Sequence, residues 1–367
     1  MKRIAIKEVC EVYDEPHATP KKTDNGPVYL GIDAITEDGM LDPSQFAHLS
    51  EEDYVKWTKR VTPQENDIVF SYEATLGRYA VIPKNFYGCL GRRLAIVRII
   101  NDELNAKWLY YYFRSPEWTS FIKNQTVKGS TVDRISIEEF PEYTIPVISL
   151  EDQNKIVDVL DKIDRKIADN KKINDYLEQQ ALLIFRYMFK NISNGSNHVG
   201  DYITPKRGKA LLSKDAIPGQ FPVIAGGLLP ATYHNRANTV APVLTISGSG
   251  ANAGYVNIWH DPIWSSDSSF IDYEMTTNVY FWYAFLKLRQ QDIFDIQTGS
   301  AQPHIYPKHI AELSIGNIDR FQIASYITQV TPLFTKAGAN IRETKRLQQL
   351  RDWLLPMLMN GQVTIED

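Results

Sequence analysis

Residues 150–190 are LEDQNKIVDVLDKIDRKIADNKKINDYLEQQALLIFRYMFK, a run with neither proline nor glycine. Apolar residues and two asparagines recur along it in alternating steps of four and three, which places them on one stripe of a helix, the pattern of a coiled coil. The predicted seam comprises Ile156, Leu160, Ile163, Ile167, Asn170, Asn174, Leu177, Ala181, Ile184 and Met188. At ~1.5 Å per residue the helix would be about 60 Å long, which suits a spacer between two heads.

Length and composition favour a soluble globular protein with two domains. The chain has 367 residues, of which 43% are hydrophobic and 23% charged. No apolar run approaches the ~20 residues that a membrane span needs, and the charged N-terminus does not resemble a signal peptide. Cys10 and Cys89 are too few for a disulfide framework or a zinc site, so we expect a cytoplasmic location. The net charge of −4 means that binding to nucleic acid would need local basic patches.

The segment before the long helix is predicted to be an α+β domain with a mostly β core. Its short apolar runs are bounded by Gly, Pro, Asn and Asp, as strands are, and an aromatic-rich run predicts one helix. The predicted strands are 28–32, 67–71, 79–82 and 94–98, and the predicted helix is 105–123.

Residues 198–320 repeat this outline. Gly129, Ser130, Ile135, Phe140 and Ile145 correspond to Gly299, Ser300, Ile305, Ile310 and Ile315, each 170 positions later. The helix pattern also recurs, because Ile173, Leu182, Phe185 and Phe189 correspond to Ile341, Leu350, Trp353 and Met357, each 168 positions later. The predicted organisation is a first head (1–149), a long helix with its linker (150–196), a second head (197–320) and a second helix (321–367).

Each helix has to bury its apolar stripe, and an antiparallel pair of the two helices is the economical arrangement. The alternative is that each helix packs alone on its own domain. In a pair, Asn170 and Asn174 would fix the register at some cost in stability. Pro332 and Gly338 are expected to kink or break the second helix.

Catalytic motifs are scarce. Residues 248–254 (GSGANAG) miss the GxGxxG spacing by one position and lack a surrounding βαβ unit, so they favour a β-turn. Residues 261–264 (DPIW) differ from the Asp-Pro-Pro-Tyr/Trp loop of adenine methyltransferases at Ile263. Glu151 and Asp152 suit the positive end of a helix dipole better than a nuclease site. The chain is therefore predicted to bind and not to catalyse.

Two similar heads on a rigid spacer suit a long partner with two separated sites. Duplex DNA is such a partner, with helical turns of about 34 Å. Because the heads differ in sequence, the two half-sites should differ, which gives an asymmetric bipartite target. Residues in predicted loops could contact phosphates and base edges, although each could equally be a solvated surface group. The candidates are Lys21, Lys22, Arg78, Lys128, Ser130 and Arg134 in the first head, and Lys206, Arg207, Lys209, Arg236, Ser300, Gln302, His304 and Lys308 in the second.

Several motifs resemble the specificity (S) subunit of type I restriction–modification systems, over essentially the whole chain. They are Thr126–Ser130 (TVKGS) with Ile135 and Ile145, residues 150–156 (LEDQNKI), the helix end 181–189 (ALLIFRYMF), and the second copy 298–303 (TGSAQP) with Ile305. The start of the second helix, residues 321–324 (FQIA), departs from the family's usual Leu-Glu-Glu-Gln-like start.

The resemblance implies two target-recognition domains, each of which reads half of a bipartite site in double-stranded DNA, with an antiparallel coiled coil between them. It also implies that methyltransferase (M) subunits dock on the helices, that restriction (R) subunits join, and that S-adenosylmethionine, ATP and Mg are held by those partners and not by this chain. The residues expected to form the coiled coil or the docking surface are the seam positions above together with Ile341, Leu350 and Trp353. An assembly factor that does not bind DNA, or an anti-restriction decoy with the same fold, is the alternative, while a self-contained methyltransferase fails on the missing cofactor motifs.

Overall fold

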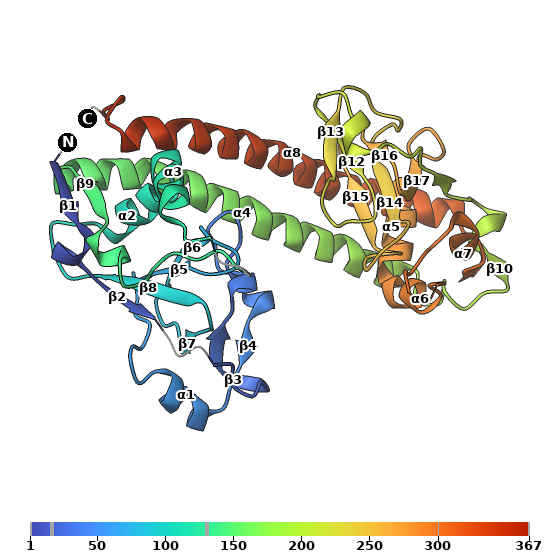
Figure 1. The fold of residues 1–367 in the computed structure, drawn as a ribbon. Coiled ribbons are helices and arrows are strands. Elements are labelled where there is room, and N and C mark those ends of the chain that lie inside the picture. Colours follow the sequence, from blue (N-terminus) through green and yellow to red (C-terminus); the bar gives the residue numbers. More distant parts are fainter. Residues whose placement is uncertain (1, 15–17, 129–131, 300, 366–367) are drawn as a thin grey trace. The chain divides into compact units, whose positions relative to one another are not determined.

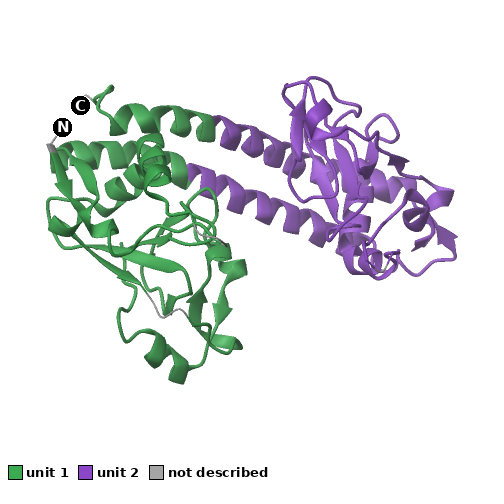
Figure 2. Ribbon diagram, viewed as in Figure 1, with its two compact units in different colours: residues 1–165, 347–367 green, residues 166–346 purple. Residues whose placement is uncertain are grey.

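The computed structural model describes residues 2–14, 18–128, 132–299 and 301–365. The chain divides into two compact units (Figure 2): unit 1 comprises residues 1–165 and 347–367, and unit 2 comprises residues 166–346. Each unit holds one mostly-β head and a part of both long helices (Figure 1), which confirms the predicted α+β class with two similar heads. In the described part of the chain, no helix combines the length and apolarity that crossing a membrane requires.

The head of unit 1 has three layers. A four-stranded sheet, in the order β2-β8-β5-β6, lies between helices α2 and α3 on one face and a three-stranded sheet, β4-β3-β7, on the other. Strands β1 and β9 pair separately. The bounds are β1 Lys2–Ala5, β2 Cys10–Asp14, β3 Thr23–Leu30, β4 Ala47–His48, α1 Glu51–Trp57, β5 Ile68–Ser71, β6 Tyr79–Val81, β7 Gly88–Leu90, β8 Leu94–Ile99, α2 Ala106–Phe113, α3 Pro116–Gln125 and β9 Thr144–Val147.

The central strand β5 shows why these layers form. Ile68 and Phe70 point into the core beneath α2, while Val69 joins the core under the smaller sheet. All four residues of β5 are buried, as expected for a strand that is covered on both faces. The strands predicted from the apolar runs are confirmed within one to a few residues.

The helix predicted over 105–123 is instead two helices, α2 and α3. Pro116 has no N–H and disfavours helical geometry at the preceding residue, so the first helix ends before it. Ser115 is then the N-cap of α3 and accepts a hydrogen bond from the Trp118 N–H at 3.2 Å.

The head of unit 2 repeats this topology. Its four-stranded sheet has the order β11-β17-β14-β15 and its three-stranded sheet the order β13-β12-β16. In each small sheet one pair is parallel, β3 with β7 and β12 with β16. The bounds are β10 Asn197–His198, β11 Lys206–Arg207, β12 Phe221–Ile224, β13 Thr232–His234, β14 Val243–Ser247, β15 Val256–Trp259, β16 Trp264–Ser265, β17 Ser268–Asp272, α5 Val279–Leu288, α6 Gln290–Asp295, α7 Pro307–Ala311 and β18 Ser314–Ile315.

The two long helices are α4 (Leu150–Met188) and α8 (Arg320–Met359). In unit 1, Leu160 near the start of α4 shares a core with Leu358 at the end of α8. In unit 2, Phe185 near the end of α4 shares a core with Tyr326 near the start of α8. The start of each helix therefore meets the end of the other, as an antiparallel pair requires.

The two asparagines of the predicted seam bridge the helices within unit 2. Asn170 is fully buried, and its Nδ2 donates to Oε2 of Glu343 at 2.9 Å. Asn174 accepts at Oδ1 from Nδ2 of Asn340 at 2.9 Å. Asn340 was not among the predicted seam residues, although it is buried as well. This polar layer pairs specific positions of α4 and α8, which fixes their register.

Several other seam positions differ in their burial. Ile156, Leu160, Ile163 and Ala181 are buried, whereas Ile167, Leu177, Ile184 and Met188 are half-buried. Ile341, Leu350 and Trp353 are 49%, 43% and 61% exposed, so they lie outside the core between the helices. The buried face of α8 is formed instead by residues such as Phe334, Ala337, Leu355 and Leu358. Aligning Ile341 with Ile173 pointed to the wrong face of α8, because Ile173 is itself exposed.

The break expected at Pro332 and Gly338 is wrong, because α8 remains α-helical through both. Pro332 lies on the exposed side, and its neighbours Val330 and Phe334 are buried in the core of unit 2. This packing outweighs the loss of one backbone hydrogen bond. Gly338 faces His260, and a Cβ built on it would lie 2.8 Å from the His260 Cβ. Glycine is thus the residue that lets α8 approach the second head.

Candidate DNA-recognition surfaces

In the first head, three segments meet beyond the end of β5. The loop that ends at Ile135 is joined to the β5–β6 turn by a hydrogen bond from the Ile135 N–H to the Tyr72 carbonyl, at 2.8 Å. The N–H of Tyr72 donates in turn to the carbonyl of Arg93, in the β7–β8 turn, at 3.2 Å. Glu73 forms a β-bridge with Arg134. The side chains of Glu73, Arg93 and Arg134 therefore belong to one small surface.

The second head forms the same junction. The Ile305 N–H donates to the Gly248 carbonyl at 3.0 Å, and the Gly248 N–H donates to the Asp267 carbonyl at 3.0 Å. Ser249 forms a β-bridge with His304, as Glu73 does with Arg134. The loop, the hairpin turn and the turn between the sheets thus meet in the same way in both heads.

Strand register identifies the equivalent residues. Ser71 pairs with Leu94 in the first head, and Ser247 pairs with Ser268 in the second. The residues that precede the second member of each pair, Arg93 and Asp267, are therefore equivalent. A cation in one head corresponds to an anion in the other.

The same reversal occurs on the neighbouring strand. Asp14 pairs with Ala95, and Arg207 with Ser269, so Asp14 and Arg207 are equivalent. In the first head Asp14 accepts from Nη1 of Arg60 at 2.8 Å. In the second, Arg207 forms an ion pair with Asp267.

Side-chain contacts complete both clusters. Arg93 Nε lies 3.2 Å from Oε1 of Glu73, and Asp267 accepts a hydrogen bond from the Ser249 hydroxyl. Burial, assisted by the Asp14 and Glu73 carboxylates, raises the pKa of Tyr72 to about 12, so its phenol stays protonated.

The hairpin turn of the first head has an unusual backbone. Ala74 has a φ of 69°, where the equivalent Gly250 has a φ of 83°. Alanine rarely adopts this conformation, which costs of order 1–3 kcal/mol and persists only where surrounding contacts hold it. The Ala74 N–H donates to the Asp133 carbonyl at 3.3 Å, so the loop that ends at Ile135 provides one of those contacts.

The predicted residues of the first head have different surroundings. Lys21, Lys22, Lys128 and Arg134 are exposed. Arg78 is partly buried, and its Nη1 donates to the Ile35 carbonyl at 2.6 Å, so this side chain supports the fold. Ser130 lies outside the described residues.

In the second head, exposed side chains comprise Lys206, Arg207, Lys209, Arg236, Gln302 and Lys308. Lys209 lies close to the turn that holds Asp267, because its N–H donates to the Ser265 carbonyl at 3.0 Å. His304 is half-buried and its ring stacks on Tyr306, with centroids 5.9 Å apart. Ser300 lies outside the described residues.

Sequence reasoning missed four residues at the centres of these surfaces, Glu73, Arg93, Ser249 and Asp267. The signal that could have found them is the repeat itself, since Ser71 and Ser247 end equivalent strands two positions before Glu73 and Ser249.

Comparison with known proteins gives the family. Residues 1–179 match the type I restriction modification DNA specificity domain. A type I restriction enzyme specificity subunit (MjaIX) from Methanocaldococcus jannaschii is 23% identical over 361 residues, which covers 87% of this chain and 82% of the relative. The chain is therefore similar to type I restriction–modification specificity subunits, by the family model over its first 179 residues and by this relative over most of its length.

The solved S subunit of a type I restriction–modification system from M. genitalium has the same fold. It is 19% identical with a TM-score of 0.57, and the likeness covers 97% of this chain and 95% of that chain. The likeness in fold extends over both heads and both long helices of the chain, and so beyond the residues that the family model matches.

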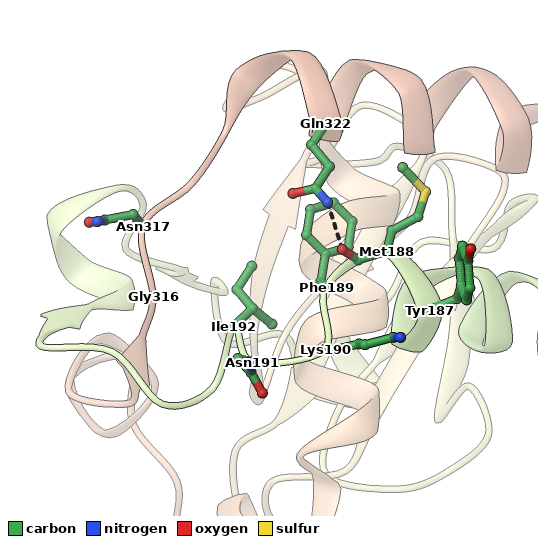
Figure 3. Close-up of a pocket in the computed structure, with 9 residues that line it drawn as sticks. All are labelled: Tyr187, Met188, Phe189, Lys190, Asn191, Ile192, Gly316, Asn317 and Gln322. Atoms are coloured by element: carbon green, nitrogen blue, oxygen red, sulfur yellow. Dashed lines mark hydrogen bonds between the residues drawn. The ribbon is translucent and has the colours of Figure 1, made fainter.

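A separate pocket of about 650 Å³ lies in unit 2, where α4 ends and α8 begins (Figure 3). Its nine lining residues include Tyr187, Lys190 and Gln322, and Nε2 of Gln322 donates to the Met188 carbonyl at 2.6 Å. Lys190 is the one lining residue with a charged side chain, so the pocket offers no converging set of ionic groups. Across the described residues, no cluster of three or more His, Cys, Asp or Glu could hold a metal ion.

Proposed function

We propose that this chain is a type I specificity subunit that recognises an asymmetric bipartite site in double-stranded DNA, with one half-site for each head. The observation that carries the proposal is the duplicated recognition surface, whose equivalent positions hold unlike side chains. Because the two surfaces share a backbone arrangement, differences between their side chains can give them different targets.

The two surfaces suit different bases and phosphates. Around the hairpin turn, the first head presents Glu73, Arg93 and Arg134, and the second presents Ser249, Asp267 and His304. Arginine pairs with guanine, carboxylates accept from cytosine N4, and serine can pair with several bases. Exposed lysines such as Lys128 and Lys209 are suited to phosphates, which position the protein without reading sequence. The net charge of −4 makes these local cations important.

We further propose that the chain is not itself catalytic and positions M and R subunits on the DNA. S-adenosylmethionine, ATP and Mg would be bound by those subunits, and the cytoplasm is the expected compartment. Because Ile156, Leu160 and Ile163 are buried within the subunit, docking would use exposed side chains of the helices. Ile341, Leu350 and Trp353 remain the predicted docking residues on α8.

Co-expression with the cognate methyltransferase tests this function. The expected result is a stable complex and one bipartite methylation motif in the host genome, while the purified chain alone neither methylates nor cleaves DNA. Arg134→Ala should change the preference for bases in one half of the motif, and His304→Ala in the other half. A complex that assembles but leaves no motif would support the decoy alternative, and turnover by the chain alone would contradict a non-catalytic role.

A further inference from the structure

Two exposed leucines lie in the middle of the connection between β12 and β13. This connection, residues 225–231, has the sequence AGGLLPA. Leu228 is 47% exposed and Leu229 is 79% exposed. Adjacent apolar side chains that face water in the free protein offer a small surface that a partner could cover.

The connection starts from the recognition surface of the second head. A Cβ on Gly226 would lie 2.4 Å from the Ser249 carbonyl oxygen and 3.6 Å from Oδ2 of Asp267. Glycine is therefore needed for the chain to pass this close. The Ser266 N–H donates to the Ile224 carbonyl at 2.7 Å, which fixes the departure point. The leucines follow within three residues of Gly226.

We propose that Leu228 and Leu229 form an apolar wedge that contacts bases in the half-site read by the second head. The inference rests on the proposed DNA-recognition function and adds a specificity element to it. Lys209, on the same side of the head, is an exposed cation that would hold a phosphate. Leucine side chains can insert between base steps or cover a thymine methyl group, as apolar residues in other DNA-binding proteins do.

Duplex DNA is favoured over a protein partner because the wedge begins at the polar cluster and not at the long helices. The wedge also distinguishes the two heads. The equivalent connection in the first head, residues 31–46, buries Ala34 and Ile35 fully, and Met40 is its one large apolar side chain that is exposed, at 47%, so it carries no adjacent exposed pair. Wedge contacts are therefore expected in one half-site.

The test uses the complex of this chain with its methyltransferase, and compares wild type with the double variant Leu228→Ala, Leu229→Ala. Binding is measured by fluorescence anisotropy over a range of salt, with the duplex identified by its methylation motif, duplexes altered in either half-site, and a random duplex. The cognate affinity should fall by about 5- to 150-fold, the effect typical of losing one base contact. The salt dependence should be unchanged, because leucine neutralises no phosphate.

Tyr273→Ala is the matched control. Tyr273 is 49% exposed in the same head and follows Asp272, whereas the recognition surface adjoins Ser268 at the other end of β17. Replacing Tyr273 should leave the affinities for the cognate duplex and for the random duplex unchanged. The wedge variant should also lose its sensitivity to base changes in one half-site and keep it in the other.

Each remaining outcome decides against the wedge. Unchanged cognate affinity would mean that the leucines do not contact DNA. Loss of the methyltransferase from the complex would identify a protein contact. If the wild-type complex itself does not distinguish cognate from random DNA, the proposed function fails, and the wedge fails with it.

Discussion

Replacing Gly338 by alanine tests whether the contact between α8 and the β15–β16 turn positions the second head. The new Cβ would lie 2.8 Å from the His260 Cβ and 3.1 Å from its Cγ. Carbon atoms in favourable contact lie about 3.5–4.0 Å apart, so the turn or the helix would have to move by roughly 0.7 Å. His260 cannot avoid the contact by changing rotamer, because its Cβ is fixed by the backbone.

Two effects oppose each other in this variant. Glycine to alanine inside a helix stabilises by about 1 kcal/mol, while crowding a packed site costs about 1–3 kcal/mol. We expect the free energy of unfolding of Gly338→Ala to fall by about 0–2 kcal/mol. The shift would also strain the ion pair between Arg342 Nη1 and Asp261 Oδ1, which are 2.9 Å apart, so the methylation rate of the complex should fall.

Urea unfolding of the full chain measures the change, and two variants calibrate it. Ala339→Gly, at the exposed next position, should lose about 1 kcal/mol from helix propensity alone. Adding His260→Gly to Gly338→Ala removes the clashing Cβ and should restore the methylation rate. If Gly338→Ala instead gains about 1 kcal/mol, as propensity alone predicts, no steric contact operates there and the reasoning is refuted.

Three further changes probe the helix pair and the second head. Asn170→Leu replaces a buried amide by an apolar group, so the calorimetric unfolding midpoint should rise, and a fall would mean that the hydrogen bond to Glu343 outweighs burial. Desolvation lowers the pKa of His260 from 6.5 to about 4; the Asp261 carboxylate opposes this shift and Arg342 adds to it. Between these pH values the unfolded state binds more protons than the folded state, so the stability of the folded protein falls as the pH drops. Wild type should lose at most about 3 kcal/mol across that range relative to His260→Phe, measured by urea unfolding at each pH. Asp267→Asn removes an anion and releases Arg207, so random-duplex affinity should rise and its logarithmic salt slope steepen by about 1, measured by anisotropy.

The fold was largely predictable because its signals are long and repeated. The heptad stripe of α4 and the recurring apolar runs each extend over many residues, so single exceptions do not hide them. The face of α8 was not predictable in the same way. Its contacts with α4 include polar residues, Asn340 and Glu343, that no apolar pattern marks. Packing against His260 also lets Gly338 remain in a helix that propensity alone would end.

The candidate recognition site was predictable only in part, since exposure and pairing depend on distant residues. Arg78 was expected to face DNA, yet it donates to the carbonyl of Ile35, which lies 43 positions away in sequence. Arg207 is paired with Asp267, which lies 60 positions away. Local sequence identified loops that carry cations but could not show which cations the fold already uses.

Duplication explains how one chain can hold two unlike recognition surfaces on the same backbone scaffold. Equivalent backbone hydrogen bonds fix the hairpin turn in both heads, so changing a side chain there leaves the scaffold intact. The turn tolerates alanine at position 74 and glycine at position 250 in the same left-handed conformation. Arg93 and Asp267 show that it also tolerates opposite charges. A specificity subunit built in this way can acquire a new half-site by substitutions on one surface, while the helix pair and the other head keep their own contacts.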